Sequence, residues 1–165
     1  MTNRFATNRR RLIALLGVGA MMPLASACSA KPVAKGTFPI RKTEAEWRRL
    51  LGAERFHILR EEGTEHPYTS PLNKEKRKGV FTCAGCATPL FASSTKYDSG
   101  TGWPSFWKPL PKVVGSSIDR SLGMTCTEVH CNQCGGHLGH VFDDGPAPTG
   151  LRYCINGLSL KFQPA

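Results

Sequence analysis

The spacing of apolar residues changes near Val80, and this change separates the predicted helices from the predicted strands. Residues 43–51 have apolar residues at helical spacing, and Thr43 and Glu46 fit a capping box at the start of a short helix. A second helical pattern covers residues 53–62 and ends at Gly63. The first helix is expected to bury one apolar face, formed by Trp47, Leu50 and Leu51.

After Val80, short runs of β-branched and apolar residues alternate with clusters of glycine, proline, serine and aspartate. The runs are VFTC, KVVGSSI, MTCTEVHC, HVF and RYCINGLSLKF. Short strands separated by turn residues are typical of antiparallel sheets. We therefore expect a mainly β domain, a small antiparallel sheet or barrel with short N-terminal helices on one side.

The first 27 residues have the composition of an export signal. Arginines precede an apolar run at residues 12–24, and small residues follow it at residues 25–27. The pair Arg9-Arg10 is similar to a twin-arginine signal, which predicts export of an already folded protein to the periplasm. An uncleaved anchor is the alternative, but the apolar run is shorter than the ~20 residues of a membrane-spanning helix.

Cys28 directly follows this signal, so the end of the signal is also similar to a lipoprotein site. Leu24 stands four residues before Cys28 rather than the usual three, which leaves lipidation and simple cleavage both open. A lipid on Cys28 is the only membrane attachment that we expect. Residues 28–40 have the composition of a linker, and residues 41–165 form the predicted domain.

The charge of the chain does not predict a polyanionic partner. The 165 residues have a formal net charge of +10. Without the four arginines of the first 27 residues, 18 basic residues stand against 12 acidic ones, a net charge of +6. This excess is too small to indicate binding to nucleic acid or to an anionic membrane.

Two C-x-x-C motifs are the strongest chemical pattern in the chain. Two residues between cysteines let one turn aim both sulfurs at one point, and two such turns supply four thiolates, which suit zinc. Four thiolates leave no open position on the metal, so the predicted zinc site is structural. Disulfides, which export favours, and a redox-active pair are the alternatives. The four predicted ligands are Cys83, Cys86, Cys131 and Cys134.

Two histidines follow the second motif, in the segment HLGHVFDD. Because four thiolates complete a zinc site, His137 and His140 are not needed as ligands. Histidine transfers protons near neutral pH, and a nearby carboxylate stabilises its charged form. The two histidines are therefore candidates for acid–base chemistry, although each taken alone fits a packed or surface position.

Cys154 stands inside RYCINGLSLKF, the last predicted strand. Side chains alternate along a strand, so Arg152, Cys154 and Asn156 are expected to share one face, which residues 158, 160 and 162 would continue. A lone cysteine is commonly a buried structural residue. A cation beside a thiol stabilises the nucleophilic thiolate, however, which favours a catalytic role for Cys154.

Several motifs, in order along the chain, closely resemble those of the B-type peptide-methionine (R)-S-oxide reductases. They are EEGTEHP, the first C-x-x-C turn, SGTGWPSF, the second C-x-x-C turn, HLGHVFDDGP and RYCIN. The resemblance covers residues 43–162. It implies a thiol-dependent enzyme that reduces methionine R-sulfoxide, free or in proteins, and so repairs oxidised proteins.

The resemblance also implies a nucleophile and a proton donor. Cys154 would attack the sulfoxide sulfur and become a sulfenic acid as methionine leaves, and Arg152 would favour the Cys154 thiolate. His140, backed by Asp144, would protonate the oxygen of the substrate. His137 and Asn156 would assist this step.

Two aromatic side chains are implied to bind the substrate. Trp103 would hold the methyl group of the substrate, an apolar contact that helps to select the R epimer. Phe142 is the second substrate-binding side chain.

The second thiol of this chain departs from one common pattern of the family. Many relatives carry a cysteine where this chain has Thr101, and an arginine where it has Cys126. We expect Cys126 to come close to the RYCIN strand and to resolve the Cys154 sulfenic acid as a disulfide. A thioredoxin-like protein would then reduce the disulfide. Cys28 as the resolving thiol and direct reduction by the external protein are the alternatives.

An exported binding module clipped by zinc, without catalysis, is the alternative function. The basic charge and the two metal-type turns are compatible with it. It does not explain why an arginine, a cysteine and an asparagine share one face, and the export signal argues against nucleic acid as the partner.

Overall fold

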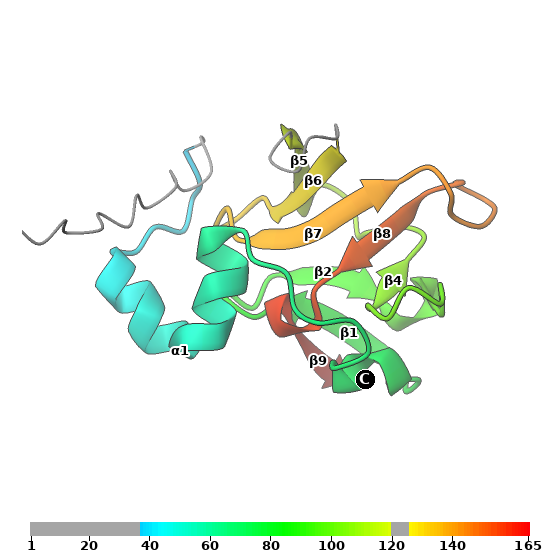
Figure 1. The fold of residues 1–165 in the computed structure, drawn as a ribbon, viewed down its shortest axis with the longest axis horizontal. Helices are drawn as coiled ribbons and strands as arrows, with labels where there is room; N and C mark the ends of the chain where they lie inside the picture. The colour runs from blue at the N-terminus through cyan, green and yellow to red at the C-terminus, as the bar shows by residue number, and fades with distance from the viewer. Residues whose placement is uncertain (1–36, 120–125) are drawn as a thin grey trace, which may run out of the picture.

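The computed structural model describes residues 37–119 and 126–165 (Figure 1). The predicted export signal, Cys28 and most of the predicted linker lie outside the described residues. Within these two ranges, no helix combines the length and apolar character needed to cross a membrane.

The helices are α1 (Glu44–Glu61) and the 3-10 helices η1 (Pro71–Lys74), η2 (Ser93–Thr95) and η3 (Gly157–Ser159). The strands are β1 (Gly79–Cys83), β2 (Pro89–Ala92), β3 (Lys96–Tyr97), β4 (Ser105–Phe106), β5 (Val114–Asp119), β6 (Cys126–Cys131), β7 (His137–Phe142), β8 (Arg152–Ile155) and β9 (Leu160–Pro164).

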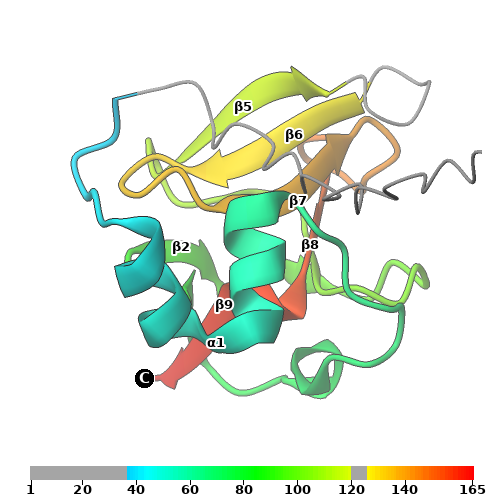
Figure 2. The ribbon, with the colours of Figure 1, turned by 60° about the vertical axis from the view of Figure 1, so that its left-hand side comes forward.

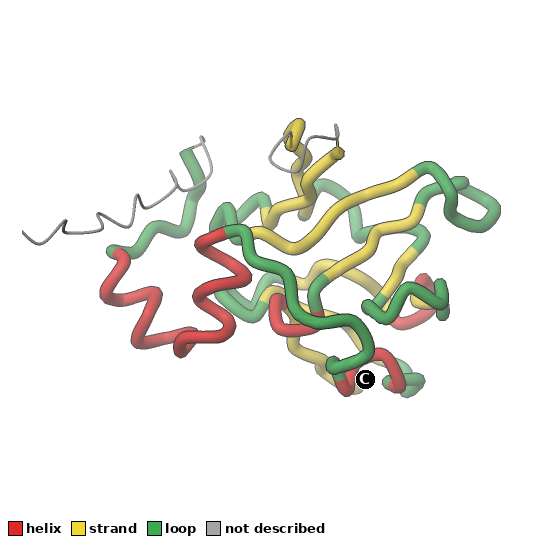
Figure 3. Tube along the Cα trace, viewed as in Figure 1, coloured by secondary structure: helices red, strands yellow, loops and turns green. Residues whose placement is uncertain are grey.

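The helix α1 contains both predicted helices and begins with the predicted capping box. The Thr43 side chain accepts a hydrogen bond from the Glu46 amide, and the Glu46 carboxylate accepts one from the Thr43 amide. Gly52 has a φ of 70° and bends α1 into two arms, which Figure 3 shows in red.

The buried face of the first arm is narrower than the sequence predicts. Trp47 and Leu51, four residues apart, are buried, whereas Leu50 is 55% exposed. The prediction that Leu50 shares the apolar face is therefore wrong. Residues four apart lie above one another on a helix, and Leu50 points to the side of that stripe.

The strands form two antiparallel sheets, so the predicted mainly β fold is confirmed. The smaller sheet has the order β2-β1-β9, and the larger has the order β3-β4-β8-β7-β6-β5. The helix α1 packs against β7 and η3, as Figures 1 and 2 show from two sides. Because both sheets have free outer strands in the described ranges, the architecture is a pair of packed sheets rather than one closed barrel.

Three phenylalanines from both sheets form the centre of the core. Phe81 on β1, Phe91 on β2 and Phe106 on β4 are fully buried. The rings of Phe91 and Phe106 stack with centroids 4.3 Å apart, and Phe81 meets Phe106 edge to face at 5.0 Å. These contacts hold the smaller sheet against the larger one through aromatic packing.

The segment RYCINGLSLKF does not form one strand. It supplies β8, turns through η3 and continues as β9 in the smaller sheet. The backbone amides of Gly157 and Leu158 donate hydrogen bonds to the buried Glu65 carboxylate rather than to a neighbouring strand. The prediction that residues 158, 160 and 162 continue the face of Cys154 is therefore wrong, because this carboxylate captures the amides where the chain turns.

Candidate functional site

Cys154 lies on β8, with paired strands on both sides. Its register partners are His140 on β7 and Ser105 on β4. Directly paired residues of antiparallel strands point to the same face of the sheet. The neighbours Tyr153 and Ile155 belong to the hydrophobic core on the opposite face. The half-buried Cys154 thiol therefore lies on the outer face of the larger sheet, beside an imidazole and a hydroxyl group.

A chain of hydroxyl groups reaches the Cys154 sulfur. Thr101 Oγ1 lies 3.8 Å from Cys154 Sγ, and Ser99 Oγ lies 2.8 Å from Thr101 Oγ1 and 2.7 Å from Ser105 Oγ. Burial raises the pKa of the Cys154 thiol, whereas the Thr101 hydroxyl and the Arg152 guanidinium lower it without cancelling the effect of burial. Arg152 thus acts in the predicted direction, but the thiol of the free protein stays protonated to higher pH than an exposed cysteine.

Asp144 pairs with Arg152, whereas the motifs predicted that it would pair with His140. Arg152 Nε and Nη2 donate to the two Asp144 carboxylate oxygens at 2.7 Å and 2.8 Å. Such bidentate, charge-assisted pairs are among the stronger hydrogen bonds in proteins. The guanidinium also lies 4.3 Å from the centroid of the Phe142 ring, across the strand pair that joins Phe142 to Arg152.

Each of the two predicted histidines has its own carboxylate partner. His140 Nε2 lies 3.0 Å from Asp119 Oδ2, and His137 Nδ1 lies 2.8 Å from Glu128 Oε1. The centroids of the two imidazole rings are 5.5 Å apart. Neither carboxylate carries a local sequence signal, because Asp119 and Glu128 reach the histidines from β5 and β6.

Glu65 connects Trp103 to the chain that follows Cys154. Trp103 Nε1 donates to the Glu65 carbonyl at 3.1 Å, and the Glu65 amide donates to Asn156 Oδ1 at 3.0 Å. Asn156 Nδ2 donates to the Leu138 carbonyl at 3.2 Å. Because β8 ends at Ile155, the alternation that placed Asn156 on the face of Cys154 does not extend to it. Asn156 instead holds the end of β8 through both ends of its amide.

The two aromatic side chains predicted to bind the substrate differ in their surroundings. Trp103 is half-buried and fixed by its hydrogen bond to Glu65. Phe142 is 36% exposed at the end of β7, with its ring centroid 6.5 Å from that of His140. An apolar ring therefore lies beside the His140 imidazole, on the outer face of the sheet.

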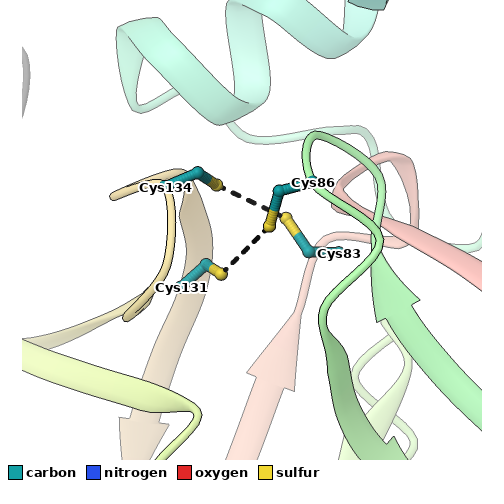
Figure 4. A group of neighbouring side chains, drawn as sticks. All are labelled: Cys83, Cys86, Cys131 and Cys134. Atoms are coloured by element: carbon teal, nitrogen blue, oxygen red, sulfur yellow. Dashed lines mark hydrogen bonds between the residues drawn. The ribbon is translucent and has the colours of Figure 1, made fainter. Parts of the chain in front are cut away.

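The two C-x-x-C motifs converge as predicted (Figure 4). Cys83 Sγ lies 3.7 Å from Cys134 Sγ, and Cys86 Sγ lies 3.6 Å from Cys131 Sγ. These distances exclude disulfides, in which the sulfurs are about 2.05 Å apart. Four sulfurs at about 2.3 Å from a tetrahedral zinc are about 3.8 Å from one another, so the cluster fits a metal ion.

The cysteine cluster joins the two sheets. Cys83 ends β1 and Cys86 lies in the turn before β2, whereas Cys131 ends β6 and Cys134 lies in the turn before β7. The α1 residue Arg60 donates through Nη1 to the Cys134 carbonyl at 2.8 Å, and so places a cation beside the sulfurs. Arg60 had no signal in the sequence, because only the packing of α1 brings it there.

Cys126 is farther from Cys154 than the sequence predicts. It begins β6, whose residue Thr127 pairs with Val141 on β7, and β7 separates β6 from β8. Two strand spacings of about 4.8 Å put the Cα atoms of Cys126 and Cys154 at least about 9 Å apart. A disulfide needs a Cα separation of about 4.4–6.8 Å. The prediction that Cys126 lies close to the RYCIN strand is therefore wrong for this arrangement.

A cleft of about 1080 Å³ lies elsewhere, between α1, η1 and β9. Ile58, Leu72 and Leu160 contribute to its walls, and none of the predicted site residues does. The Cys154–His140 pair and the cysteine cluster therefore lie outside this cleft, whereas Glu65, which binds Trp103 and Asn156, forms part of its wall.

Comparison with known proteins assigns the family. A family model described as the SelR domain matches residues 51–164, which include every predicted site residue from Cys83 to Asn156. This chain belongs to the SelR family. The peptide methionine sulfoxide reductase MsrB of Agrobacterium fabrum is 54% identical to this SelR-family chain over 126 residues, 76% of this chain and 93% of that protein.

Other SelR-family relatives are similarly close. The peptide methionine sulfoxide reductase MsrB of Leptospira interrogans is 53% identical over 127 residues, 76% of this chain and 97% of that protein. The protein of the same name from Methanosarcina barkeri is 52% identical over 125 residues, 75% of this chain and 88% of that protein. The family resemblance predicted from the motifs is therefore confirmed.

The hydroxyl beside Cys154 generates a prediction about thiol reactivity. Without the Thr101 hydroxyl, the pKa of Cys154 rises further, and a smaller fraction of the thiol is ionised at a given pH. In Thr101→Val we expect iodoacetamide to modify Cys154 about three- to tenfold more slowly at pH 8, because alkylation follows the thiolate fraction. Peptide mass spectrometry would follow this one thiol. Thr101→Ser should keep the wild-type rate, and equal rates for Thr101→Val and wild type would contradict the prediction.

Proposed function

We propose that this chain reduces methionine R-sulfoxide, free or in oxidised proteins, with Cys154 as the nucleophile. The observation that carries the proposal is the pairing of Cys154 with His140 across β8 and β7, in a chain that belongs to the SelR family. A thiol and an imidazole on one face supply the two groups that the reaction needs, an attacking sulfur and a proton.

The reaction oxidises Cys154 and reduces the substrate by two electrons. The Cys154 thiolate bonds to the sulfoxide sulfur as the His140 imidazolium protonates the oxygen. The hydroxyl group then passes from the substrate sulfur to Cys154, with cleavage of the S–O bond of the substrate and of the bond between the two sulfurs. Methionine leaves, and Cys154 carries the oxygen as a sulfenic acid. The arrangement of the site modifies the roles that the motifs predict, since His140 has Asp119 as its carboxylate partner and Asp144 holds Arg152.

Trp103 and Phe142 are the proposed apolar contacts of the substrate. The Trp103 ring is fixed by its hydrogen bond to Glu65, which also binds the Asn156 side chain. We infer that these two hydrogen bonds of Glu65 fix the Trp103 ring, as an apolar wall, relative to Cys154. Such a wall accepts the methyl group of one epimer of the sulfoxide and not of the other.

The proposed activity predicts the behaviour of a Cys154 variant. Wild-type protein with dithiothreitol should convert dabsyl-methionine R-sulfoxide to dabsyl-methionine and leave the S epimer unchanged, as read by chromatography. Cys154→Ala should lose at least about a thousandfold of this activity, because the nucleophile is absent. Its thermal midpoint should stay close to that of the wild type.

A binding module without catalysis is the second candidate, favoured only by the metal-type cysteine cluster and the basic charge. Absence of R-epimer turnover in folded wild-type protein would support the binding module. Full turnover by Cys154→Ala would rule out Cys154 as the nucleophile.

We propose that the four clustered cysteines bind one structural zinc ion. The support is the fit of their sulfur separations to a tetrahedral zinc site and the presence of the Arg60 cation beside them. Zinc held by four thiolates supplies no water for catalysis. Its contribution is to hold the β1–β2 turn against the β6–β7 turn.

The zinc proposal predicts a linked loss of metal and stability. Purified wild-type protein should contain about one zinc per chain by metal analysis, and Cys134→Ser should contain much less. The variant should unfold at a temperature lower by at least about 10 °C, since structural zinc contributes several kcal/mol to folding. The matched control Cys126→Ser, which removes a thiol outside the cluster, should keep its zinc. Two disulfides and no metal in the wild type would overturn the proposal.

We also propose that Cys126 resolves the Cys154 sulfenic acid and that a thioredoxin-like protein reduces the disulfide. Among the described cysteines outside the metal cluster, Cys126 is the one other than Cys154, and it is half-buried at the start of β6. The separation across β7 requires the end of β6 to move toward Cys154 by several ångströms. Cys28 and direct reduction by the external protein are the competing routes.

The recycling proposal predicts that the two reductants will respond differently to Cys126→Ser. Turnover driven by thioredoxin should fall at least about tenfold, whereas turnover driven by dithiothreitol should not change, because a small dithiol reduces the sulfenic acid directly. Mass spectrometry of the oxidised wild type should find a disulfide between residues 126 and 154. Unchanged turnover with thioredoxin, together with no such disulfide, would exclude Cys126 and leave the two competing routes.

For location, we propose that residues 1–27 direct export to the periplasm by a twin-arginine-like signal. The support is the order of basic, apolar and small residues in this segment. A cysteine next to the predicted cleavage point allows lipidation of Cys28 as a second form of the mature protein.

A further inference from the structure

His137 differs from His140 in its burial and in its free ring nitrogen. His137 is 3% exposed, whereas the side chain of His140 is 21% exposed. A carboxylate only accepts hydrogen bonds, so the contact with Glu128 places a proton on His137 Nδ1. The other nitrogen, Nε2, is buried and has no hydrogen-bond partner among the described residues. Buried polar atoms are rarely left without a partner, and a functional role is one reason for an exception.

Glu128 is itself held in place by a second hydrogen bond. The Ser117 hydroxyl donates to Glu128 Oε2 at 2.5 Å, while Oε1 accepts from His137. Burial acts to raise the pKa of Glu128, but the hydrogen bonds from His137 and Ser117 outweigh it and keep this pKa below its usual value. Glu128 is therefore a nearly buried carboxylate that stays ionised.

Strand register aligns this carboxylate with the nucleophile. Ser117 pairs with Glu128, Glu128 pairs with His140, and His140 pairs with Cys154, in one row across four strands. Directly paired residues point to one face, so Glu128 lies on the same outer face as the Cys154 thiol. His137 reaches into this row from β7 and has its ring next to that of His140.

We propose that Glu128 is a positioning residue that acts through His137, whose fixed ring holds the His140 imidazole in place to protonate the substrate oxygen. The inference rests on the proposed reductase function and adds a residue to it. Glu128 holds the His137 ring with its proton on Nδ1, and this ring packs against the His140 ring at a centroid distance of 5.5 Å.

The proton balance of the step follows from this geometry. The His140 imidazolium gives a proton to the oxygen as the Cys154 thiolate bonds to the sulfoxide sulfur. The hydroxyl group then passes from the substrate sulfur to Cys154 and the bond between the two sulfurs breaks. Cys154 ends as a sulfenic acid, methionine leaves with its sulfur reduced by two electrons, and the His140 ring remains neutral. The hydrogen bond between His137 and Glu128 is intact before and after the transfer, and solvent returns the proton to the partly exposed His140 ring after methionine has left.

Several charged or titratable groups lie on the elements around His137, and an experiment must separate the effect of Glu128 from the effects of the others. They are Glu128 and His130 on β6, His140 on β7 with Asp119 on β5 behind it, Cys154 on β8, and Arg60 of α1 at the Cys134 carbonyl. Of these, Glu128 is the group with a hydrogen bond to the His137 ring.

The test compares Glu128→Gln with wild type in a single turnover without reductant, so that recycling does not limit the rate. Glutamine keeps the size of the side chain and an oxygen for His137 Nδ1, but removes the charge. We expect the rate of methionine formation at pH 7.5 to fall about tenfold, since a well-placed proton donor contributes about 10²- to 10⁴-fold to a rate and a displaced ring loses part of this. The rate at which iodoacetamide alkylates Cys154 needs no proton donor and should stay within about twofold of that of the wild type.

The matched control uses a second histidine–carboxylate pair of this chain. His57 Nδ1 lies 3.0 Å from Glu61 Oε2 on the exposed surface of α1. Glu61→Gln removes the same charge from the same kind of pair, and it should leave the rate of methionine formation unchanged.

Nitrogen NMR of His137 gives a readout that does not depend on activity. In the wild type, the ¹⁵N shifts should report a proton on Nδ1 across neutral pH. In Glu128→Gln, this preference should weaken. An unchanged tautomer together with an unchanged rate of methionine formation in folded Glu128→Gln would overturn the inference. Absence of methionine from wild-type protein would instead overturn the proposed function, while the NMR result would still show whether Glu128 controls His137.

Discussion

The pairing of β7 with β8 is the contact on which the site depends. It places His140 directly opposite Cys154, and Gly139 makes the close approach possible. A side chain on Gly139 would collide with the Cys154 carbonyl, and the φ of 153° at this position is one that glycine adopts easily. A shift of one residue in this register would turn Cys154 toward the aromatic core and Tyr153 toward solvent. Both the chemistry and the packing therefore hold the same alignment.

The cysteine cluster and the aromatic core both hold the two sheets together, but by different interactions. Phe81, Phe91 and Phe106 provide apolar contact that has no strict geometry. The four cysteines provide a geometry that two distant turns satisfy together. Because β6 and β7 extend from the cluster to Glu128 and His140, the cluster also restrains the strands that carry these two residues.

The site separates its charges into local pairs. Arg152 is bound by Asp144, His140 by Asp119 and His137 by Glu128, so each of these three basic side chains has a carboxylate within hydrogen-bonding distance. Burial of the Cys154 thiol favours its neutral form in the absence of substrate, and the neighbouring hydroxyl and guanidinium oppose this effect. A thiol in such a position is less exposed to unwanted oxidation and still lies beside the groups that stabilise its reactive form.

The sequence by itself determined the features that depend on neighbouring residues. The capping box of Thr43 and Glu46, the two C-x-x-C turns and the strand that carries Cys154 all follow from patterns a few residues long. The tertiary structure decided the pairings that join different strands. Asp119 and Glu128 reach the histidines, Asp144 binds Arg152, and Glu65 ends the Cys154 strand, because strand register and chain reversal bring together groups that are far apart in sequence. The distance from Cys126 to Cys154 belongs to the same class, since the number of strands between two residues is set by the order of the sheet and not by their spacing in the chain.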